Sequence, residues 1–410
     1  MGEPLKIVHV ITGLNPGGAE TWLARLLGRL PAERFDSRVV SLLDGGELSG
    51  VIRSLGVPVT SLGMGRGLPD PRGLWRLARL LREQRPQVVQ TWLYHADLLG
   101  LLAARWSGCG AAVSWGLRCA HMDLASYGLG TRLTLRACVE LSGWPEAVTA
   151  NSQAGAEHHL ALGYRPRRLA VLENGVDGGL FRADPEARAR LRSEWGREWA
   201  VPEGAPLIGL VARVDPMKGH AVFCRAAQEL LRARPDARFL FCGAGTEPGD
   251  DGPGSGELDA LIARHGLGGA VVRLGRREDV AQVYAALDVL ALPSLGEGFP
   301  NAVLEALACA VPCVCLDVGD ARAMCGPGGL VAPAELSGPG ASAADRAGFL
   351  VRALGQVLGL SASERSELGA RGRAHVLERY GLTRAVERWA THFESLASGQ
   401  RLLADTSKVR

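Results

Sequence analysis

Two glutamates, Glu297 and Glu305, lie in a segment whose residue types and spacing favour ligand binding. The segment 293–307 reads PSLGEGFPNAVLEAL and follows an apolar run at 289–292 that predicts a strand. Glu297 stands between two glycines in the expected turn, and Glu305 lies on the helix that follows. Ligands of open α/β sheets bind at such strand ends, so both carboxylates are candidates to hold ligand hydroxyls. In the structural alternative, Glu297 caps the helix and Glu305 is solvated.

The same turn supplies backbone donors. Gly298, Phe299 and Asn301 stand where the helix begins, and Pro300 suits a first helical turn. The first amides of a helix have no intrahelical acceptor, so they can donate to hydroxyl or phosphate oxygens.

Two cations follow the strand expected at 207–212. The segment 209–220 reads GLVARVDPMKGH and contains Arg213 and Lys218, in a chain with only three lysines. Arginine offers a fork of donors and lysine a mobile point charge, and together they can neutralise a leaving diphosphate without a divalent metal. The alternative is a pair of solvated loop cations.

Candidates in the first half also follow expected strands. Gly17 and Gly18, in the segment GLNPGGAE at 13–20, allow close approach of a phosphate or sugar to a helix N-terminus. His95 follows the strand expected at 88–92, and Arg118 and His121 follow the next one. A lone histidine is more often structural, so only its position at a strand end makes His95 a candidate, and the same structural alternative is stronger for Arg118 and His121.

Alternating strands and helices must position these residues. We expect strands at 6–12, 37–42, 57–62, 88–92, 111–115, 147–150 and 168–172, and then at 207–212, 238–242, 271–274, 289–292 and 313–316. This alternation predicts an α/β fold with two doubly wound, mostly parallel sheets. We place the domains at 1–185 and 186–375, with a helical segment at 376–410 that returns to the N-terminal domain and frays at its end.

Composition narrows the functional class. A net charge of +3 over 410 residues is too small for a dedicated nucleic-acid binder, and nine cysteines without a CxxC pair predict neither a disulfide framework nor a zinc site. No secretory signal or membrane-spanning apolar run is evident, so we expect a cytoplasmic protein. No metal-ligand cluster is present in the sequence, so we expect no bound metal. The amphipathic helix expected at 71–82 either lies on an anionic bilayer or crosses over the sheet, and its narrow apolar stripe favours the second interpretation.

Taken in order, these motifs resemble those of a retaining glycosyltransferase of family 4, the GT-B type. The resemblance runs from about residue 6 to about 331 and is carried by Gly17-Gly18-Ala-Glu20, Ala150-Asn151-Ser152, Glu173-Asn-Gly-Val-Asp177, Val211-Ala-Arg213 with Lys218-Gly219, Gly243-Ala-Gly245, and the segment from Glu297 to Glu305. The family implies two Rossmann-like domains facing across a cleft and a UDP- or GDP-sugar as co-substrate, with no other cofactor and no metal. It also implies transfer to a glycan or lipid-linked acceptor, with retention of anomeric configuration, in surface polysaccharide or glycolipid biosynthesis.

The resemblance assigns roles to the candidate residues. Lys218 and Arg213 hold the diphosphate, Glu305 the ribose and Glu297 the donor sugar, while Gly17, Gly18 and His95 approach from the first domain. The acidic Gly- and Pro-rich loop after Gly245 is longer than expected, and Arg322 leaves the base pocket unassigned.

Two other functions remain open: a GT-B-fold sugar-nucleotide epimerase, or a catalytically silent partner subunit. Relatives that build lipid-linked polymers also make a peripheral membrane contact an expectation.

Overall fold

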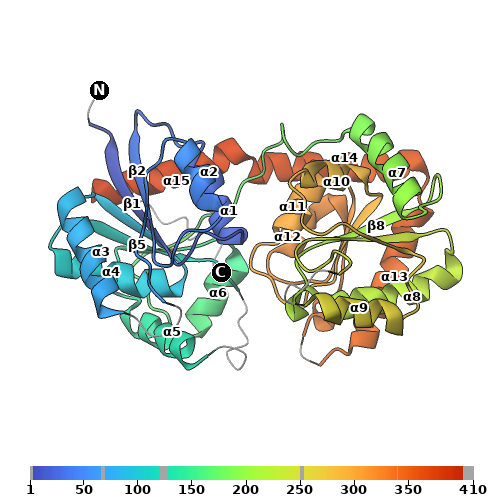
Figure 1. Cartoon of the computed structure of the whole chain (residues 1–410), viewed down its shortest axis with the longest axis horizontal. Helices are drawn as coiled ribbons and strands as arrows, with labels where there is room; N and C mark the ends of the chain where they lie inside the picture. Colours follow the sequence, from blue (N-terminus) through green and yellow to red (C-terminus); the bar gives the residue numbers. More distant parts are fainter. Residues whose placement is uncertain (1–2, 66–69, 121–127, 250–253, 339, 400–410) are drawn as a thin grey trace. The chain divides into compact units, whose positions relative to one another are not determined.

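The computed structural model describes residues 3–65, 70–120, 128–249, 254–338 and 340–399, which fold into two compact units (Figure 1). The first unit comprises residues 1–175 and 383–410, and the second comprises Val176–Leu382. We describe each unit by itself.

The sheet of the first unit has seven strands in the order β3-β2-β1-β4-β5-β6-β7, and all neighbouring pairs are parallel. The strands are β1 (Leu5–Ile11), β2 (Phe35–Ser41), β3 (Val59–Ser61), β4 (Val88–Trp92), β5 (Ala112–Leu117), β6 (Ala147–Ala150) and β7 (Leu169–Val171). Their apolar, β-branched sequences suit strands buried on both faces.

Helices cover both faces of this sheet. Val8 and Val10 of β1 pack with residues of α3 (Pro71–Gln84), α4 (Tyr94–Ser107) and α5 (Leu129–Leu141). His9, between them, points to the opposite face and packs against Phe393 of α15 (Leu382–Ala397). The remaining helices are α1 (Gly18–Leu27), α2 (Leu48–Ser54) and α6 (Gln153–Ala161).

Helix α3 confirms the crossover interpretation of the segment 71–82. Asp70 caps it by accepting from the Arg72 amide at 2.9 Å, and Pro71 occupies its first turn. Leu77 and Leu81 are buried in the core, so the apolar stripe faces the sheet.

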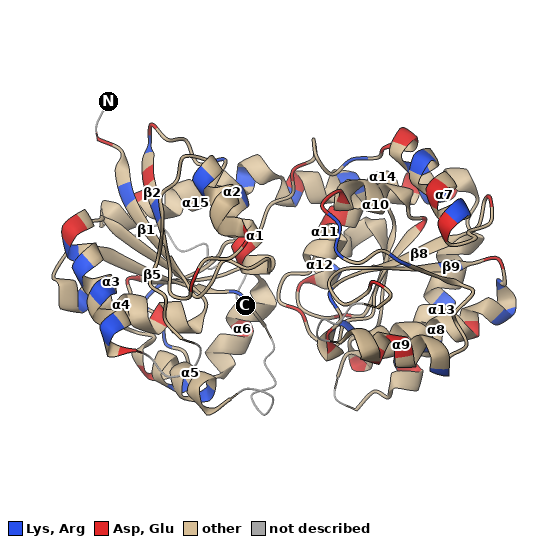
Figure 2. Cartoon of the chain, viewed as in Figure 1, with Lys and Arg blue, Asp and Glu red and all other residues tan. Residues whose placement is uncertain are grey.

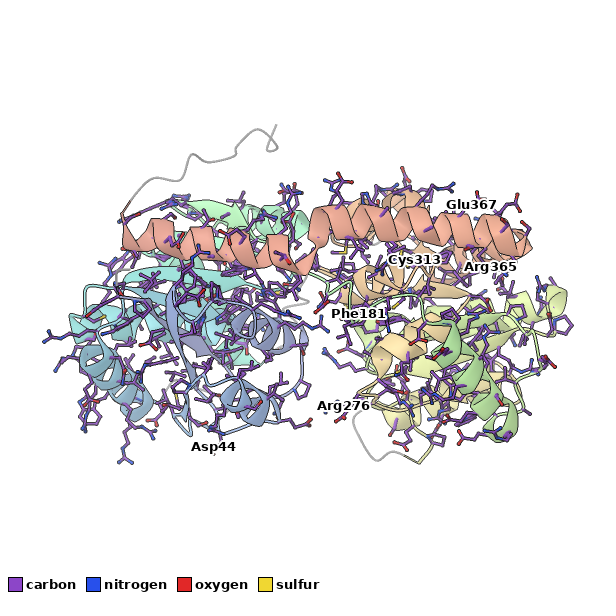
Figure 3. The ribbon with its side chains drawn as sticks, turned by 90° about the horizontal axis from the view of Figure 1, so that it is seen from above. Asp44, Phe181, Arg276, Cys313, Arg365 and Glu367 are labelled. Carbon is purple, nitrogen blue, oxygen red and sulfur yellow. The ribbon has the colours of Figure 1, made fainter. Side chains whose placement is uncertain are left out.

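The second unit has a six-stranded parallel sheet in the order β10-β9-β8-β11-β12-β13. Its strands are β8 (Leu207–Val211), β9 (Arg238–Cys242), β10 (Val271–Arg273), β11 (Val289–Leu292), β12 (Cys313–Cys315) and β13 (Gly329–Val331). One face packs against α8 (His220–Ala233), α9 (Ser255–Arg264) and α13 (Ala343–Gly359). The other packs against α7 (Pro185–Glu198), α10 (Val280–Ala286), α11 (Asn301–Ala308), α12 (Ala321–Cys325) and α14 (Ala362–Tyr380), which carries Arg365 and Glu367 near its start (Figure 3).

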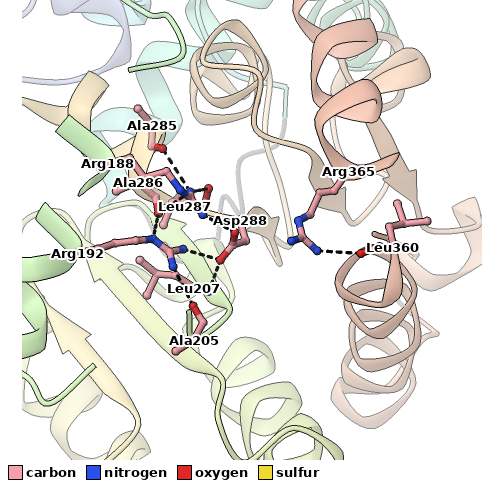
Figure 4. Close-up of polar contacts among 10 residues, drawn as sticks. All are labelled: Arg188, Arg192, Ala205, Leu207, Ala285, Ala286, Leu287, Asp288, Leu360 and Arg365. Atoms are coloured by element: carbon pink, nitrogen blue, oxygen red, sulfur yellow. Dashed lines mark hydrogen bonds and ion pairs between the residues drawn. The ribbon is translucent and has the colours of Figure 1, made fainter. Parts of the chain in front are cut away.

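Ion pairs attach α7 to this sheet. Arg188 and Arg192 contact the carboxylate of Asp288 at 2.6 and 2.5 Å, and Asp288 also accepts from the amide of Leu207 (Figure 4). Burial raises the pKa of Asp288, but these cations outweigh it and hold the pKa below its usual value. Asp184 caps α7 by accepting from the Ala187 amide at 2.9 Å.

The unit boundaries differ from the expected positions 185 and 375. Val176 donates its amide to Tyr380 and Phe181 is buried in the core of the second unit, so 176–185 belongs there. Trp389 stacks on Trp92, which places α15 in the first unit. Sequence reasoning also missed β13 and α13. The expected frayed end at 401–410 lies outside the described residues.

All nine cysteines lie within the described ranges, and none forms a disulfide. None of the described helices is both long and apolar enough to cross a bilayer.

Candidate functional site

Most of the candidate residues follow the strands at which chain order reverses in each sheet, and Arg118 follows the neighbouring strand β5. In the second unit this switch point lies between β8 and β11, and in the first between β1 and β4. Loops leaving such adjacent strands in opposite directions open a crevice at the carboxyl edge of the sheet. Residues that are far apart in the sequence can meet here, because the loops after two adjacent strands start side by side.

In the second unit, the structure brings Lys218 and Glu297 together. The Lys218 Nζ donates to Glu297 Oε1 at 2.7 Å, and the Ser294 hydroxyl donates to the same oxygen at 2.8 Å. The side chains of Lys218 and Glu297 are 24% and 11% exposed, whereas Ser294 is buried. A partly buried cation and carboxylate therefore stand at the end of β11 and within reach of a ligand.

Backbone contacts hold the two loops in register. The Leu295 amide donates to the Met217 carbonyl at 2.8 Å. Gly219 has φ +70°, and a Cβ on it would lie 2.0 Å from the Pro293 carbonyl oxygen. Only glycine fits this approach, so Gly219 sets the separation between Lys218 and the Glu297 turn.

Glu305 is held by a buried hydroxyl. The Tyr284 Oη on α10 donates to Glu305 Oε2 at 3.2 Å, and Tyr284 is 1% exposed. Burial raises the pKa of Tyr284 well above its usual value, and the Glu305 carboxylate adds to the effect, so the hydroxyl stays a donor. Glu305 is therefore buried and held in one orientation, so the alternative in which it is solvated is wrong.

Arg213 takes a different position from Lys218. The Arg213 side chain is 62% exposed, and its guanidinium pairs with Asp215 at 2.9 Å. Burial opposes ionisation of Asp215, but the Met217 amide and Arg213 lower its pKa below the usual value. A contact between Arg213 and a diphosphate stays a prediction.

In the turn after Glu297, the side chain of Phe299 belongs to the core, whereas backbone groups remain for a ligand or for other loops. The Phe299 ring packs edge-on against Tyr380 and is buried, so only its backbone can serve a ligand. Gly298 accepts from the Asp320 amide at 3.1 Å. Helix α11 begins at Asn301, one residue after Pro300, and the amides of its first turn have no acceptor within the helix.

In the first unit, Gly17 caps α1 and Gly18 is its first residue. A Cβ on Gly17 would lie 2.5 Å from Glu20 Oε2, so the Glu20 carboxylate folds back over this helix N-terminus. A negative side chain at that end is favourable to the helix dipole. The approach of a phosphate or sugar to Gly17 and Gly18 stays a prediction.

His95 follows an unusual backbone turn. Leu93 adopts φ +76° between β4 and α4, a conformation that non-glycine residues rarely take. His95 is half-buried, and burial lowers its pKa. Beside it, Asp97 accepts from Thr91 at 2.5 Å and from the Gly116 amide at 3.2 Å, while its burial raises its pKa to about 8.

Arg118 lies at the end of β5, as predicted. It donates to Asn174 Oδ1 at 2.6 Å and stacks over the Trp92 ring at 5.1 Å. Burial lowers its pKa to about 9, against the opposing charge of Glu20. His121, the other candidate predicted after this strand, lies outside the described residues, as do residues 250–253 of the acidic loop. Within the described part of the chain, no group of three His, Cys, Asp or Glu side chains could hold a metal ion.

Sequence reasoning missed the residues that orient the two glutamates. Ser294 lies inside the quoted segment and could have been noticed. Tyr284 could not, because its link to Glu305 depends on how α10 packs against α11.

Comparison with known proteins matches both halves of the chain. A model described as "Glycosyltransferase Family 4" matches residues 16–178, and one described as "Glycosyl transferases group 1" matches residues 205–347.

Among curated relatives, a 2-deoxystreptamine glucosyltransferase of Streptomyces kanamyceticus is 31% identical over 242 residues, 58% of each chain. The chain therefore spans little more than half the length of that relative. A UDP-Gal:alpha-D-GlcNAc-diphosphoundecaprenol alpha-1,3-galactosyltransferase of Escherichia coli is 26% identical over 76% of this chain and 79% of its own.

Among solved structures, Anabaena HepE in complex with UDP-glucose superposes with a TM-score of 0.78 at 21% identity, covering 95% of this chain and 100% of that one. At this identity the likeness establishes the fold: two Rossmann-like domains of the GT-B type, as the sequence predicts.

Proposed function

Because this chain belongs to the group 1 and family 4 glycosyltransferases, we propose that it transfers a sugar from a UDP- or GDP-sugar to a glycan or lipid-linked acceptor. The observation that carries the proposal is the Lys218–Glu297 pair at the switch point of the second unit. A cation beside a carboxylate suits a donor whose diphosphate is negative and whose sugar presents hydroxyls.

Lys218 makes the main contribution to catalysis by stabilising the leaving diphosphate. Negative charge grows on the diphosphate as the sugar leaves, and a positioned cation in a partly buried site stabilises that charge. Arg213 adds a second cation when its guanidinium exchanges Asp215 for phosphate. The first amides of α11 offer further donors.

The two glutamates grip the sugar and the ribose. Oε1 of Glu297 already accepts from Lys218 and Ser294, so this carboxylate is better suited to accept from a sugar hydroxyl than to remove a proton. That arrangement supports transfer with retention, in which the leaving phosphate takes the acceptor's proton. Glu305, oriented by the Tyr284 hydroxyl, binds the ribose hydroxyls.

The name of one relative suggests the class of acceptor. The galactosyltransferase of Escherichia coli is named for a diphosphoundecaprenol-linked acceptor. We propose an acceptor of this kind, in surface polysaccharide or glycolipid synthesis, with a peripheral membrane contact and no requirement for a metal.

The first experiment is a thermal-shift screen of UDP, GDP and their sugars, because a ligand selective for the folded state raises its melting temperature. The stabilising donor is then incubated with lipid-linked acceptors, and the anomeric configuration of the product is read by NMR with and without a chelator. Donor alone serves as the control, since an epimerase interconverts the sugar without an acceptor. Absence of stabilisation by every nucleotide would contradict the proposal.

A further inference from the structure

Arg273, the last residue of β10, carries a charged side chain that is only 10% exposed. Burying a guanidinium is costly unless its nitrogens find acceptors. Here all three nitrogens do: Nε donates to the Thr246 carbonyl at 2.8 Å, Nη2 to the Glu247 carbonyl at 3.2 Å, and Nη1 to Asp259 Oδ1 at 2.5 Å. Arg273 therefore holds two successive carbonyls of the loop that follows β9. We call residues 243–247 the β9 loop.

The β9 loop is a tight turn whose two ends are joined. The amide and the hydroxyl of Thr246 both donate to the Gly243 carbonyl, at 3.1 and 2.9 Å. Thr246 is fully buried. Because one carbonyl accepts both of these bonds, holding Thr246 in place also holds Gly243 in place.

Gly243 lies directly against the turn after β8 that carries Arg213. Gly243 has φ +145°, and a Cβ on it would lie 2.2 Å from the Ala212 carbonyl oxygen and 2.8 Å from the Arg213 amide nitrogen. The Val214 amide donates to the Ala244 carbonyl at 2.8 Å. The two backbones are thus in close contact on both sides of Arg213, so a displacement of the β9 loop also displaces the Arg213 turn.

We propose that Arg273 is a positioning residue for the diphosphate of the donor. The inference rests on the proposed function, in which Arg213 exchanges Asp215 for phosphate. The position of the Arg213 backbone then decides where this cation meets the diphosphate. The nitrogens of Arg273 already have acceptors, so Arg273 acts on the donor through the β9 loop and the Arg213 turn.

The chemistry of arginine suits this role. A planar guanidinium offers donors in fixed directions, which match two successive carbonyls and a carboxylate, whereas a lysine ammonium is a single point charge. Figure 2 shows acidic residues on α9, the helix that carries Asp259. The Asp259 side chain is 51% exposed, so its ion pair contributes little free energy and mainly orients Arg273.

A second arginine of the same sheet provides a matched control. Arg238, at the start of β9, donates to the carbonyls of Pro235, Asp236 and Ala237 at 3.3, 3.2 and 2.9 Å. These carbonyls precede β9 and therefore lie at the amino edge of the parallel sheet, whereas the Arg213 turn lies at the carboxyl edge. Substitution of Arg238 thus removes contacts of the same kind without reaching the candidate site.

The test is isothermal titration of the full chain with UDP and with GDP, in the absence of acceptor. For the nucleotide that binds the wild-type chain more tightly, we expect Arg273→Gln to raise the dissociation constant by roughly tenfold, because the β9 loop loses its donors. Arg273→Lys should recover only part of this loss. Asp259→Asn should weaken binding by about two- to threefold, and Arg238→Gln should leave it unchanged.

Two further measurements separate positioning from a general loss of stability. In steady-state transfer, Arg273→Gln should raise the KM for the donor more than it lowers kcat. If Arg273 acts through the Arg213 turn, adding Arg273→Gln to Arg213→Gln should weaken nucleotide binding by less than about threefold more, because the cation to be positioned is already absent.

An unchanged dissociation constant in Arg273→Gln, or the same loss in Arg273→Gln and Arg238→Gln, would overturn the inference and leave the proposed function intact. Full additivity of the Arg273 and Arg213 substitutions would do the same. If Arg273→Gln fails to fold, Asp259→Asn decides the question, since this exposed carboxylate can be changed without disturbing the core. Failure of the wild-type chain to bind either nucleotide would overturn the proposed function, and this inference with it.

Discussion

The Nζ of Lys218 lies 2.7 Å from Oε1 of Glu297, although 79 residues separate them in the sequence. Loops after β8 and β11 bring them together, and Ser294 donates to the same carboxylate oxygen. These two donors orient the Glu297 carboxylate. In the proposed function, the diphosphate of the donor contacts Lys218 in place of Glu297 or together with it.

We expect Lys218→Met and Glu297→Ala each to reduce turnover by at least about 100-fold, because each removes a charge that acts on the transition state. Both variants should stay folded but melt at a somewhat lower temperature, since each leaves a partly buried charge without its partner. Steady-state transfer and thermal unfolding measure the two effects. Lys6→Met, at an exposed lysine of β1, is the matched control. Transfer at the wild-type rate by both site variants would contradict the proposed role of the Lys218–Glu297 pair.

Tyr284→Phe tests the orientation of Glu305. The variant keeps the buried ring but removes the hydroxyl that donates at 3.2 Å. Hydrogen bonds to charged groups contribute about 1.5–3 kcal/mol, so we expect the KM for the donor to rise by roughly tenfold while kcat changes little. Tyr164→Phe, a buried tyrosine of the first unit, is the control. An unchanged KM would mean that packing alone holds Glu305 in place.

Gly219→Ala tests the spacing of the two loops. The substitution forces a Cβ toward the Pro293 carbonyl at a residue with φ +70°. We expect a loss of more than about 2 kcal/mol in the free energy of unfolding and a loss of transfer, because the backbone must shift. Denaturant unfolding measures the first effect. Gly268→Ala, where a Cβ meets open space, should be nearly neutral. Equal stability of the two variants would show that the loops tolerate a wider separation.

Acid should destabilise the first unit through its buried histidines. Burial lowers the pKa of His9 from 6.5 to about 3, so the folded chain excludes a proton that the unfolded chain binds. Stability therefore falls as the pH drops from 6.5 toward 3. We expect His9→Phe to show a smaller loss of melting temperature between pH 7 and about 4.5 than the wild-type chain. Parallel curves for the two proteins would assign acid sensitivity to other groups, such as His392, whose pKa burial also lowers to about 3.

Much of the fold could be predicted because strands buried on both faces leave continuous apolar runs. The bounds of β4, β6, β9 and β11 agree with the predicted ones. The short strand β13 was missed, because Gly329–Val331 carries too few apolar residues to stand out. The unit boundaries were displaced for a related reason: the chain after Gly175 has no linker composition, and only its packing against α14 assigns it to the second unit.

In the candidate site, too, the sequence predicted which residues take part, whereas the structure was needed to find their partners. Residue types at strand ends were enough to single out Lys218, Glu297 and Glu305, because parallel strands in an open sheet deliver their following loops to one edge. Their partners were decided by tertiary structure alone. Whether Lys218 meets Glu297 and whether Tyr284 reaches Glu305 depend on the packing of elements that are distant in sequence. Local sequence specifies an element and where it ends, whereas long-range hydrogen-bond partners and exposure are decided only when several elements pack into one core.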